Sequence, residues 1–183
     1  MLTFSGVHGT TSKRAEKIQR TGFTIKPAEQ YARMFGNGVY MYEGTNAGKI
    51  YAFLWGKSIL SKEKIDDEEP CVLIVDIVFS EDEFIEWTEE EEMELGRWLN
   101  EEKTNISSDG KLTRKIQNQY RMRFISASAK RMRKQYRIIF AQMPIPHNLS
   151  KHGKKRYKAC AVKDISVLPK PPYAQAEYGG EWL

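Results

Sequence analysis

Three short segments of this chain carry side chains that suit a flat, polar ligand. His8-Gly9-Thr10 closes an apolar run, Tyr40 follows the turn Gly36-Asn37-Gly38, and Tyr51 lies eleven residues after Tyr40. A glycine at the end of a strand lets a ligand come close to the backbone. Histidine and tyrosine supply hydrogen bonds and flat rings. Taken singly, these residues also suit a structural histidine and ordinary core tyrosines.

In this order and spacing, the three segments resemble the NAD-binding half of the poly(ADP-ribose) polymerase-like ADP-ribosyltransferases, the diphtheria-toxin-type group with a His-Tyr motif. In that family a strand-end histidine precedes Gly and Ser or Thr. A Gly-x-Gly-[Ile/Val]-Tyr-[Phe/Met] motif and a further tyrosine follow. Here His8-Gly9-Thr10, residues 36–41 and Tyr51 fill these places. The likeness covers residues 2–79 well and the C-terminal half only loosely.

The resemblance implies a mono-ADP-ribosyltransferase that moves ADP-ribose from NAD to a macromolecular acceptor and uses no metal. It assigns the catalytic roles to His8 and Tyr40. His8 would bond the adenosine ribose, the Gly9 backbone would pair with the nicotinamide amide, and Thr10 would lie near the same ribose. Tyr40 and Tyr51 would sandwich the nicotinamide ring. Preorganised groups around the anomeric carbon would then stabilise its developing positive charge.

Two positions depart from the family pattern. Gly48 stands where the family has a serine that bonds the nicotinamide amide, so this contact is lost or moved. Lys158 stands where many active members have a glutamate, so we do not expect chain elongation to poly(ADP-ribose). A one-residue shift of the strand would turn Lys158 outward and bring in Tyr157 or Ala159.

The missing glutamate leaves several alternatives open. A carboxylate from Glu43, Glu177 or Glu181 would replace it, although each also fits an ordinary surface acid. A pseudoenzyme that binds NAD or ADP-ribose without transfer is the second alternative, favoured by Gly48 and Lys158. An RNA 2′-phosphotransferase shares the His-Gly-Thr start, but the two tyrosines fit that activity less well.

Basic residues are concentrated in the second half of the chain. The net charge of +5 comes from 29 Lys and Arg against 24 Asp and Glu. Residues 110–163 hold sixteen of these basic residues and no acid, so the remainder carries thirteen basic and 24 acidic residues. Such segregation predicts a polyanionic partner. The alternative is that the acidic stretch 81–102 folds back on the basic one, where each surface pair contributes little.

We expect the acceptor to bind the basic loop before the last strand and the basic helix that precedes it. Phosphate contacts from Lys and Arg, with base stacking on Tyr120 and Phe124, favour RNA or DNA over an acidic protein acceptor. A role as a toxin component or defence effector would add an inhibitory partner protein. The candidate acceptor-binding residues are Lys151, Lys154, Lys155, Arg156, Arg131 and Lys134, in a surface that also includes Arg114, Lys115, Arg121, Arg123, Lys130 and Arg133.

Hydrophobic periodicity predicts the elements that position these residues. Strands are expected at residues 2–7, 38–41, 70–79, 137–141, 157–162 and 165–167. Helices are expected at residues 13–20, 46–55, 89–102 and 112–133, and a loop over the nucleotide at 23–35. The run 70–79 is apolar almost throughout, which is typical of a strand buried on both faces.

We therefore expect one ADP-ribosyltransferase-like domain over residues 1–183. Its class is α+β, with a split, mostly antiparallel sheet around an NAD cleft and a helical insertion at about 81–134. A chain of 183 residues with 40% hydrophobic content suits a single core. It shows neither a long apolar run nor a leader, so we expect a cytoplasmic protein without membrane contact. Cys71 and Cys160 are expected to be buried thiols.

Overall fold

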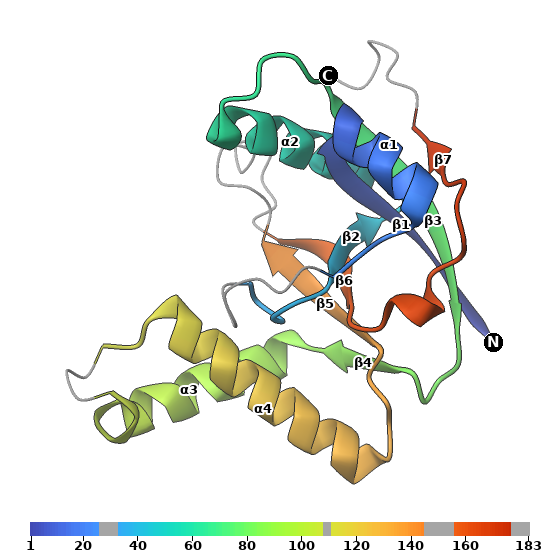
Figure 1. The fold of residues 1–183 in the computed structure, drawn as a ribbon. Coiled ribbons are helices and arrows are strands. Elements are labelled where there is room, and N and C mark those ends of the chain that lie inside the picture. Colours follow the sequence, from blue (N-terminus) through green and yellow to red (C-terminus); the bar gives the residue numbers. More distant parts are fainter. Residues whose placement is uncertain (26–32, 108–110, 145–155, 177–183) are drawn as a thin grey trace.

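The computed structural model describes residues 1–25, 33–107, 111–144 and 156–176. They form an α+β fold with four α-helices and a mixed seven-stranded sheet (Figure 1). The strands are β1 (Leu2–Thr11), β2 (Val39–Glu43), β3 (Pro70–Phe79), β4 (Phe84–Trp87), β5 (Ile138–Pro144), β6 (Arg156–Val162) and β7 (Ala174–Gln175). The helices are α1 (Ser12–Thr21), α2 (Asn46–Glu63), α3 (Glu89–Ile106) and α4 (Arg114–Met132), with a 3-10 turn, η2 (Ile165–Val167).

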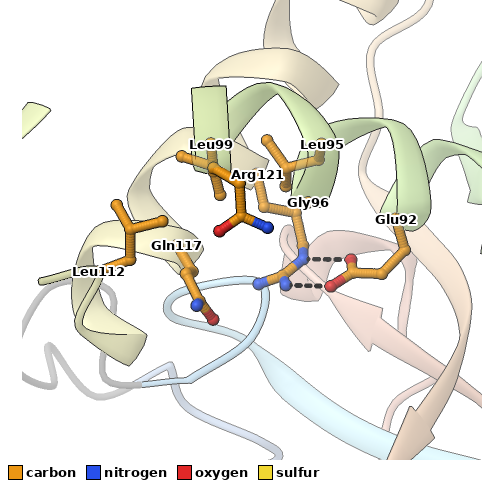
Figure 2. A pocket seen from close by; sticks show the side chains of 8 residues that line it. Glu92, Leu95, Gly96, Leu99, Leu112, Gln117 and Arg121 are labelled. Atoms are coloured by element: carbon orange, nitrogen blue, oxygen red, sulfur yellow. Dashed lines mark hydrogen bonds and ion pairs between the residues drawn. The ribbon is translucent and has the colours of Figure 1, made fainter. Parts of the chain in front are cut away.

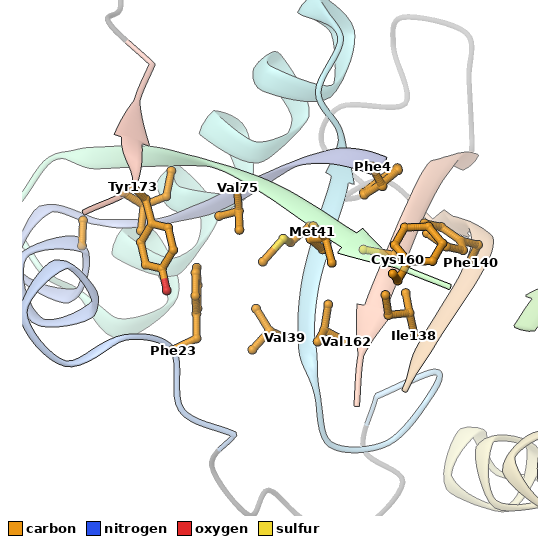
Figure 3. Close-up of a cluster of buried hydrophobic side chains, with 14 residues drawn as sticks. Phe4, Phe23, Val39, Met41, Val75, Ile138, Phe140, Cys160, Val162 and Tyr173 are labelled. Atoms are coloured by element: carbon orange, nitrogen blue, oxygen red, sulfur yellow. The ribbon is translucent and has the colours of Figure 1, made fainter. Parts of the chain in front are cut away.

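The strands lie in the order β4-β5-β6-β2-β1-β3-β7. Every neighbouring pair is antiparallel except β4 and β5, which run parallel. Side chains alternate between the two faces of a strand. On one face, Phe4, Met41 and Val75 pack with Ala15 of α1, and we call it the α1 face. Figure 3 shows this cluster, which Tyr173 completes from the C-terminal segment.

Two separate groups of helices cover the opposite face, which we call the α2 face. At one end α2 covers β1 and β3, where Ala52 packs against Val7. At the other end α3 and α4 cover β4 and β5, where Leu95 and Ile125 pack with Ile139. The middle of this face, over β2 and β6, lies between the two groups of helices. It is where the tyrosines described below are found.

Local signals explain where the helices begin. The side chains of Thr45, Thr88 and Thr113 cap α2, α3 and α4 by accepting a hydrogen bond from a backbone N–H of the first turn. In α3 the side chain of Glu91 completes a capping box with Thr88. Helix α1 ends at Gly22, whose φ of 77° suits glycine. The cap at Thr45 places the start of α2 directly after β2.

The α+β class and most expected elements are confirmed, but several details differ. Residues 165–167 form η2 and not a strand, and α2 continues to Glu63. The segment 81–134 is not wholly helical, because it begins with β4, which is too short to show a periodicity. Cys160 is buried as expected, whereas Cys71 is only half-buried. Of the expected loop at 23–35, residues 26–32 lie outside the described residues. None of the helices in the described part of the chain is long and apolar enough to cross a membrane.

Candidate functional site

β1 and β2 separate where the candidate residues lie. The two strands pair only at Gly6 with Glu43 and at Val7 with Tyr42, whereas β1 pairs with β3 along its whole length. Strand β2 continues past this point, paired with β6 on its other edge. We call the opening between residues 8–10 of β1 and 39–41 of β2 the seam. His8, Gly9, Thr10 and Tyr40 all border it.

The ring of His8 bridges the seam. Its Nδ1 lies 2.9 Å from the backbone carbonyl of Tyr40, and it must be the donor because a carbonyl oxygen only accepts. The ring also packs edge-on against Phe23, with centroids 5.1 Å apart. Burial lowers the pKa of His8; the bond to Tyr40 opposes this shift and the positive charge of Arg33 adds to it. The ring is therefore neutral at pH 7, with Nε2 as an acceptor.

The backbone of Gly9 faces the seam. On the β2 side, the carbonyl of Ser5 accepts from the N–H of Gly44 at 2.7 Å. Because hydrogen-bonding groups of an antiparallel strand alternate in direction, Val7 and Gly9 also point theirs toward β2. In a regular ladder the N–H of Gly9 would donate to the carbonyl of Tyr40. Here the ring of His8 donates to that carbonyl, and the β1–β2 pairing ends before Gly9.

Helix α2 packs so closely on the seam strands that two positions have no room for a side chain. A Cβ atom on Gly9 would lie 1.8 Å from the carbonyl oxygen of Ala52. A Cβ atom on Gly48 would lie 1.8 Å from the carbonyl oxygen of Glu43. The N–H of Gly48 also donates to Thr45 in the helix cap, at 3.2 Å. This packing explains physically why glycine stands where the family resemblance has serine.

The hydroxyl of Tyr40 folds back onto the turn before β2. It donates to the carbonyl of Gly36 at 2.7 Å and accepts from the N–H of Phe35 at 3.1 Å. The guanidinium of Arg33 lies 5.6 Å from the ring centroid. Burial raises the pKa of Tyr40 to about 12, so the phenol stays protonated. Tyr40 therefore holds the edge of the seam.

Lys163, which directly follows β6, donates hydrogen bonds to the same turn. Its Nζ donates to the carbonyl of Phe35 at 2.6 Å and also to that of Asn37. Burial lowers the pKa of Lys163 to about 8. Sequence reasoning missed this residue, since its partners are backbone carbonyls far away in the chain, which leave no pattern in the sequence.

Tyr51 lies in a group of three tyrosines on the α2 face. Its buried ring is 5.0 Å from the ring of Tyr157 and 6.0 Å from that of Tyr42. The hydroxyl of Tyr157 is hydrogen-bonded to the side chain of Thr45. No ring contact joins Tyr51 to Tyr40 within the described residues, so the sandwich of these two tyrosines stays a prediction. The sequence analysis did not assign Tyr42 to the site.

Lys158 lies on the α1 face, away from the three tyrosines. Its Nζ pairs with the carboxylate of Glu43 across the β2–β6 ladder at 3.1 Å. On the α2 face the residue opposite Tyr42 is Ala159. Lys158 therefore does not lie among the three tyrosines, but it shares the α1 face with Glu43. Glu177 and Glu181, the other two candidate acids, lie outside the described residues.

Among the predicted acceptor residues that the structure describes, Arg156 and Lys134 lie far from each other. Arg156 begins β6, opposite Pro144. Lys134 lies near the other end of the β5–β6 ladder, with Nζ 4.5 Å from the ring centroid of Phe84. Seven residues of strand separate these ends by roughly 20 Å. Arg131 is exposed on α4, and Lys151, Lys154 and Lys155 lie outside the described residues.

The placement of Arg121 on the basic surface was wrong. This residue is 5% exposed and forms a bidentate pair with Glu92 of α3, while Asn118 accepts a further hydrogen bond at 2.6 Å. Trp87 also donates to Glu92, at 2.7 Å. Figure 2 shows the pair beside a pocket of about 130 Å³ between α3 and α4, with Gly96 in its wall. Arg121 thus joins the two helices.

In residues 1–25, 33–107, 111–144 and 156–176, no cluster of three or more His, Cys, Asp or Glu side chains could hold a metal ion. Comparison of this chain with protein-family models, curated proteins and solved structures found no match.

Proposed function

We propose that this chain is a mono-ADP-ribosyltransferase that binds NAD at the seam between β1 and β2. One observation carries the proposal: His8 takes the carbonyl of Tyr40 that a regular ladder would give to Gly9. We infer that the N–H and C=O of Gly9, beyond the end of the β1–β2 pairing, pair with a ligand across the seam. A carboxamide offers the complementary donor and acceptor side by side, and nicotinamide carries this group.

Other groups near the seam suit the rest of NAD. The Nε2 atom of His8 can accept from a ribose hydroxyl, because Nδ1 holds the proton. Tyr42, Tyr51 and Tyr157 offer aromatic faces beside the start of α2 for stacking the nicotinamide ring. The family resemblance of the N-terminal segments implies the same ligand.

The reaction breaks the bond between the anomeric carbon and the nicotinamide nitrogen, and nicotinamide leaves with the electron pair. The acceptor nucleophile then forms a bond to the same carbon and loses its proton. A nearby carboxylate would stabilise the positive charge on the ribose. On the three strands β1, β2 and β6, Glu43 is the only acid. We infer that Glu43 supplies this charge, which requires the nicotinamide ribose to lie on the α1 face with His8, across the seam from a ring stacked on the three tyrosines.

Binding of NAD or ADP-ribose without transfer is the second candidate. A specific observation favours it, because Ala159 is the β6 residue opposite Tyr42 and offers no acid there. The carboxylate of Glu43 is also partly neutralised by Lys158. In this case the seam would still bind nicotinamide, and only the transfer step would be missing.

The experiment follows label from NAD onto RNA, single-stranded DNA, duplex DNA and a cell-protein extract, while calorimetry measures NAD binding. Wild type is compared with Tyr40→Phe and Tyr173→Phe. Each variant loses a hydroxyl that donates to a backbone carbonyl, but the hydroxyl of Tyr173 bonds Pro169 and does not hold the turn at the seam. Loss of label with Tyr40→Phe alone supports the transferase. NAD binding without label on any acceptor supports the second candidate, and no NAD binding contradicts both.

A further inference from the structure

The outer side of the α3–α4 pair carries an exposed group of aromatic rings. The ring of Trp98 on α3 lies 5.2 Å from that of Tyr120 and 5.6 Å from that of Phe124, both on α4. Phe124 is 37% exposed, and the other two are partly exposed. A larger cluster under the two helices already contains the core residues Leu95, Leu99, Ile125 and Ala129. Trp98 and Tyr120 pack against the outer side of this cluster, and Phe124 is the most exposed of the three rings.

Basic side chains border these rings. The guanidinium of Arg123 lies 5.0 Å from the ring centroid of Tyr120. Arg131 follows Tyr120 and Phe124 at helical spacing, so it lies on the same side of α4. Helix α4 has six basic residues and no acid. Arg121 is buried against Glu92, and the other five are exposed. No ion pair engages these five in the described part of the chain.

This surface is joined to the candidate site. Arg121, one residue after Tyr120, donates to the carbonyl of Met34 at 3.3 Å. Met34 belongs to the turn that Tyr40 and Lys163 hold at the edge of the seam. A strand lying along α4 would thus run beside the turn that borders the NAD site.

We propose that Trp98, Tyr120 and Phe124, with Arg123 and Arg131, form a platform that binds single-stranded nucleic acid. Aromatic faces stack on bases of any sequence, and the arginines track phosphates. The bases of a duplex are already stacked on one another and do not reach such a surface. The role of the platform as the acceptor surface rests on the proposed function, whereas binding of the strand does not.

The charges of the two helices favour a nucleic acid over an acidic protein and orient it. Glu94, Glu101 and Glu102 of α3 lie on the Trp98 side of the pair, where they repel phosphates. The sugar-phosphate backbone is therefore held along α4, and the bases point across the rings. The Asp and Glu side chains of an acidic peptide carry no ring that stacks, so they would use only the arginines.

The test measures anisotropy of a labelled single-stranded RNA of about twelve nucleotides, close to the length that such platforms cover. The same RNA as a duplex and poly-glutamate are the comparison ligands. We expect Phe124→Ala to weaken single-strand binding about tenfold, because a stacking partner is lost. Arg131→Gln should lower the slope of log affinity against log salt by about one. Quenching of Trp98 fluorescence should accompany binding and be lost in Trp98→Phe.

The matched control is Trp55→Ala on α2. Trp55 is 41% exposed and has Lys62 over its ring at 5.5 Å, so it pairs an aromatic face with a cation but lies on another helix. RNA affinity unchanged in Trp55→Ala and reduced in Phe124→Ala supports the platform. Equal losses in both variants, no binding by wild type in low salt, or equal binding of poly-glutamate would overturn it. NAD binding by Phe124→Ala is measured in parallel, so a failure of the platform is distinguished from a failure of the NAD site.

Discussion

Glu43 on β2 and Lys158 on β6 form an ion pair at 3.1 Å, and both side chains point away from the face that carries Tyr42. The family resemblance aligned Lys158 with a catalytic glutamate. The pair instead leaves Glu43 as the acid that borders the seam strands, next to a lysine that holds it. The proposed role of Glu43 in stabilising the positive charge on the ribose can be tested separately from NAD binding.

We expect Glu43→Gln to lower the rate of ADP-ribose transfer at least about tenfold and to leave NAD affinity unchanged, because a charge that acts on the transition state contributes little to ground-state binding. Both side chains of the pair are partly exposed, so the free energy of unfolding should change by less than about 1 kcal/mol. Single-turnover transfer and urea unfolding measure the two effects. Lys158→Gln is the control, since it removes the partner and keeps the carboxylate. An unchanged transfer rate in Glu43→Gln would remove Glu43 from the mechanism.

A serine at position 48, as the family resemblance implies, should destabilise the protein. A Cβ atom there would lie 1.8 Å from the carbonyl oxygen of Glu43, so Gly48→Ser must push α2 away from β2. We expect a loss of about 2 kcal/mol or more in unfolding free energy, with weaker NAD binding. Gly96→Ala in α3 is the matched control, because its added Cβ meets no atom within 4 Å. That variant should gain about 0.5–1 kcal/mol from helix propensity. Similar effects in both variants would contradict the close packing.

The buried pair of Arg121 and Glu92 should be essential for the α3–α4 unit. Arg121→Met leaves the Glu92 carboxylate without its main partner, and we expect a loss of about 3 kcal/mol. The exposed neighbour Arg123 provides the control, since Arg123→Met should cost well under 1 kcal/mol, in the range of surface changes. Urea unfolding compares the two variants. Equal stabilities would show that Arg121 is not buried in solution.

The same pair predicts how stability depends on pH in the acid range. Burial alone would raise the pKa of Glu92, but hydrogen bonds from Arg121 and Trp87 outweigh burial and lower it. A lowered folded-state pKa means that the stabilisation is complete above the unfolded value near 4.5 and is lost as pH falls through the folded value. Wild type should therefore lose more stability than Glu92→Gln when the pH is brought from neutral to below the folded value. Parallel acid profiles would contradict this.

The lowered pKa of His8 predicts a second effect of pH on stability, which begins at a higher pH than that of Glu92. Burial lowers its pKa from 6.5, so the unfolded chain takes up a proton at a higher pH than the folded chain does. The contribution of His8 to stability should therefore be constant above about pH 6.5 and fall as the pH drops toward the folded value. In His8→Gln this fall should be absent, while the loss due to Glu92 remains. Thermal unfolding between neutral and mildly acidic pH measures the difference.

How much the sequence could predict depended on how local each signal was. β3 was predicted to the residue, since its nearly unbroken apolar run needs no other part of the chain to explain it, although Asp76 and Val78 are exposed and the strand is not buried on both faces throughout. β4 was missed, because its four residues pair with β5 far along the chain and carry no periodicity of their own. Arg121 was misplaced, because the helical pattern of α4 does not show that Glu92 of another helix faces it.

In the candidate site, too, the residues with a local sequence signal could be predicted and the contacts between distant segments could not. The positions of His8, Gly9 and Tyr40 on the two strands could be expected from short motifs. The contacts of Tyr51 with Tyr42 and Tyr157 could not, since they depend on which face of β6 turns toward α2. The seam itself depends on where the β1–β2 pairing stops, which no composition or spacing reveals.

The backbone amide of Gly9 provides the most direct test of the NAD site. In a ¹⁵N–¹H spectrum, nicotinamide should shift the Gly9 signal at lower concentration than nicotinic acid does, because the carboxylate of nicotinic acid offers no donor to the Gly9 carbonyl. In His8→Ala the carbonyl of Tyr40 is free to pair with Gly9 again, so hydrogen exchange at Gly9 should slow and the response to nicotinamide should disappear. A Gly9 amide that ignores nicotinamide, or that exchanges equally in wild type and His8→Ala, would contradict the seam as a binding site.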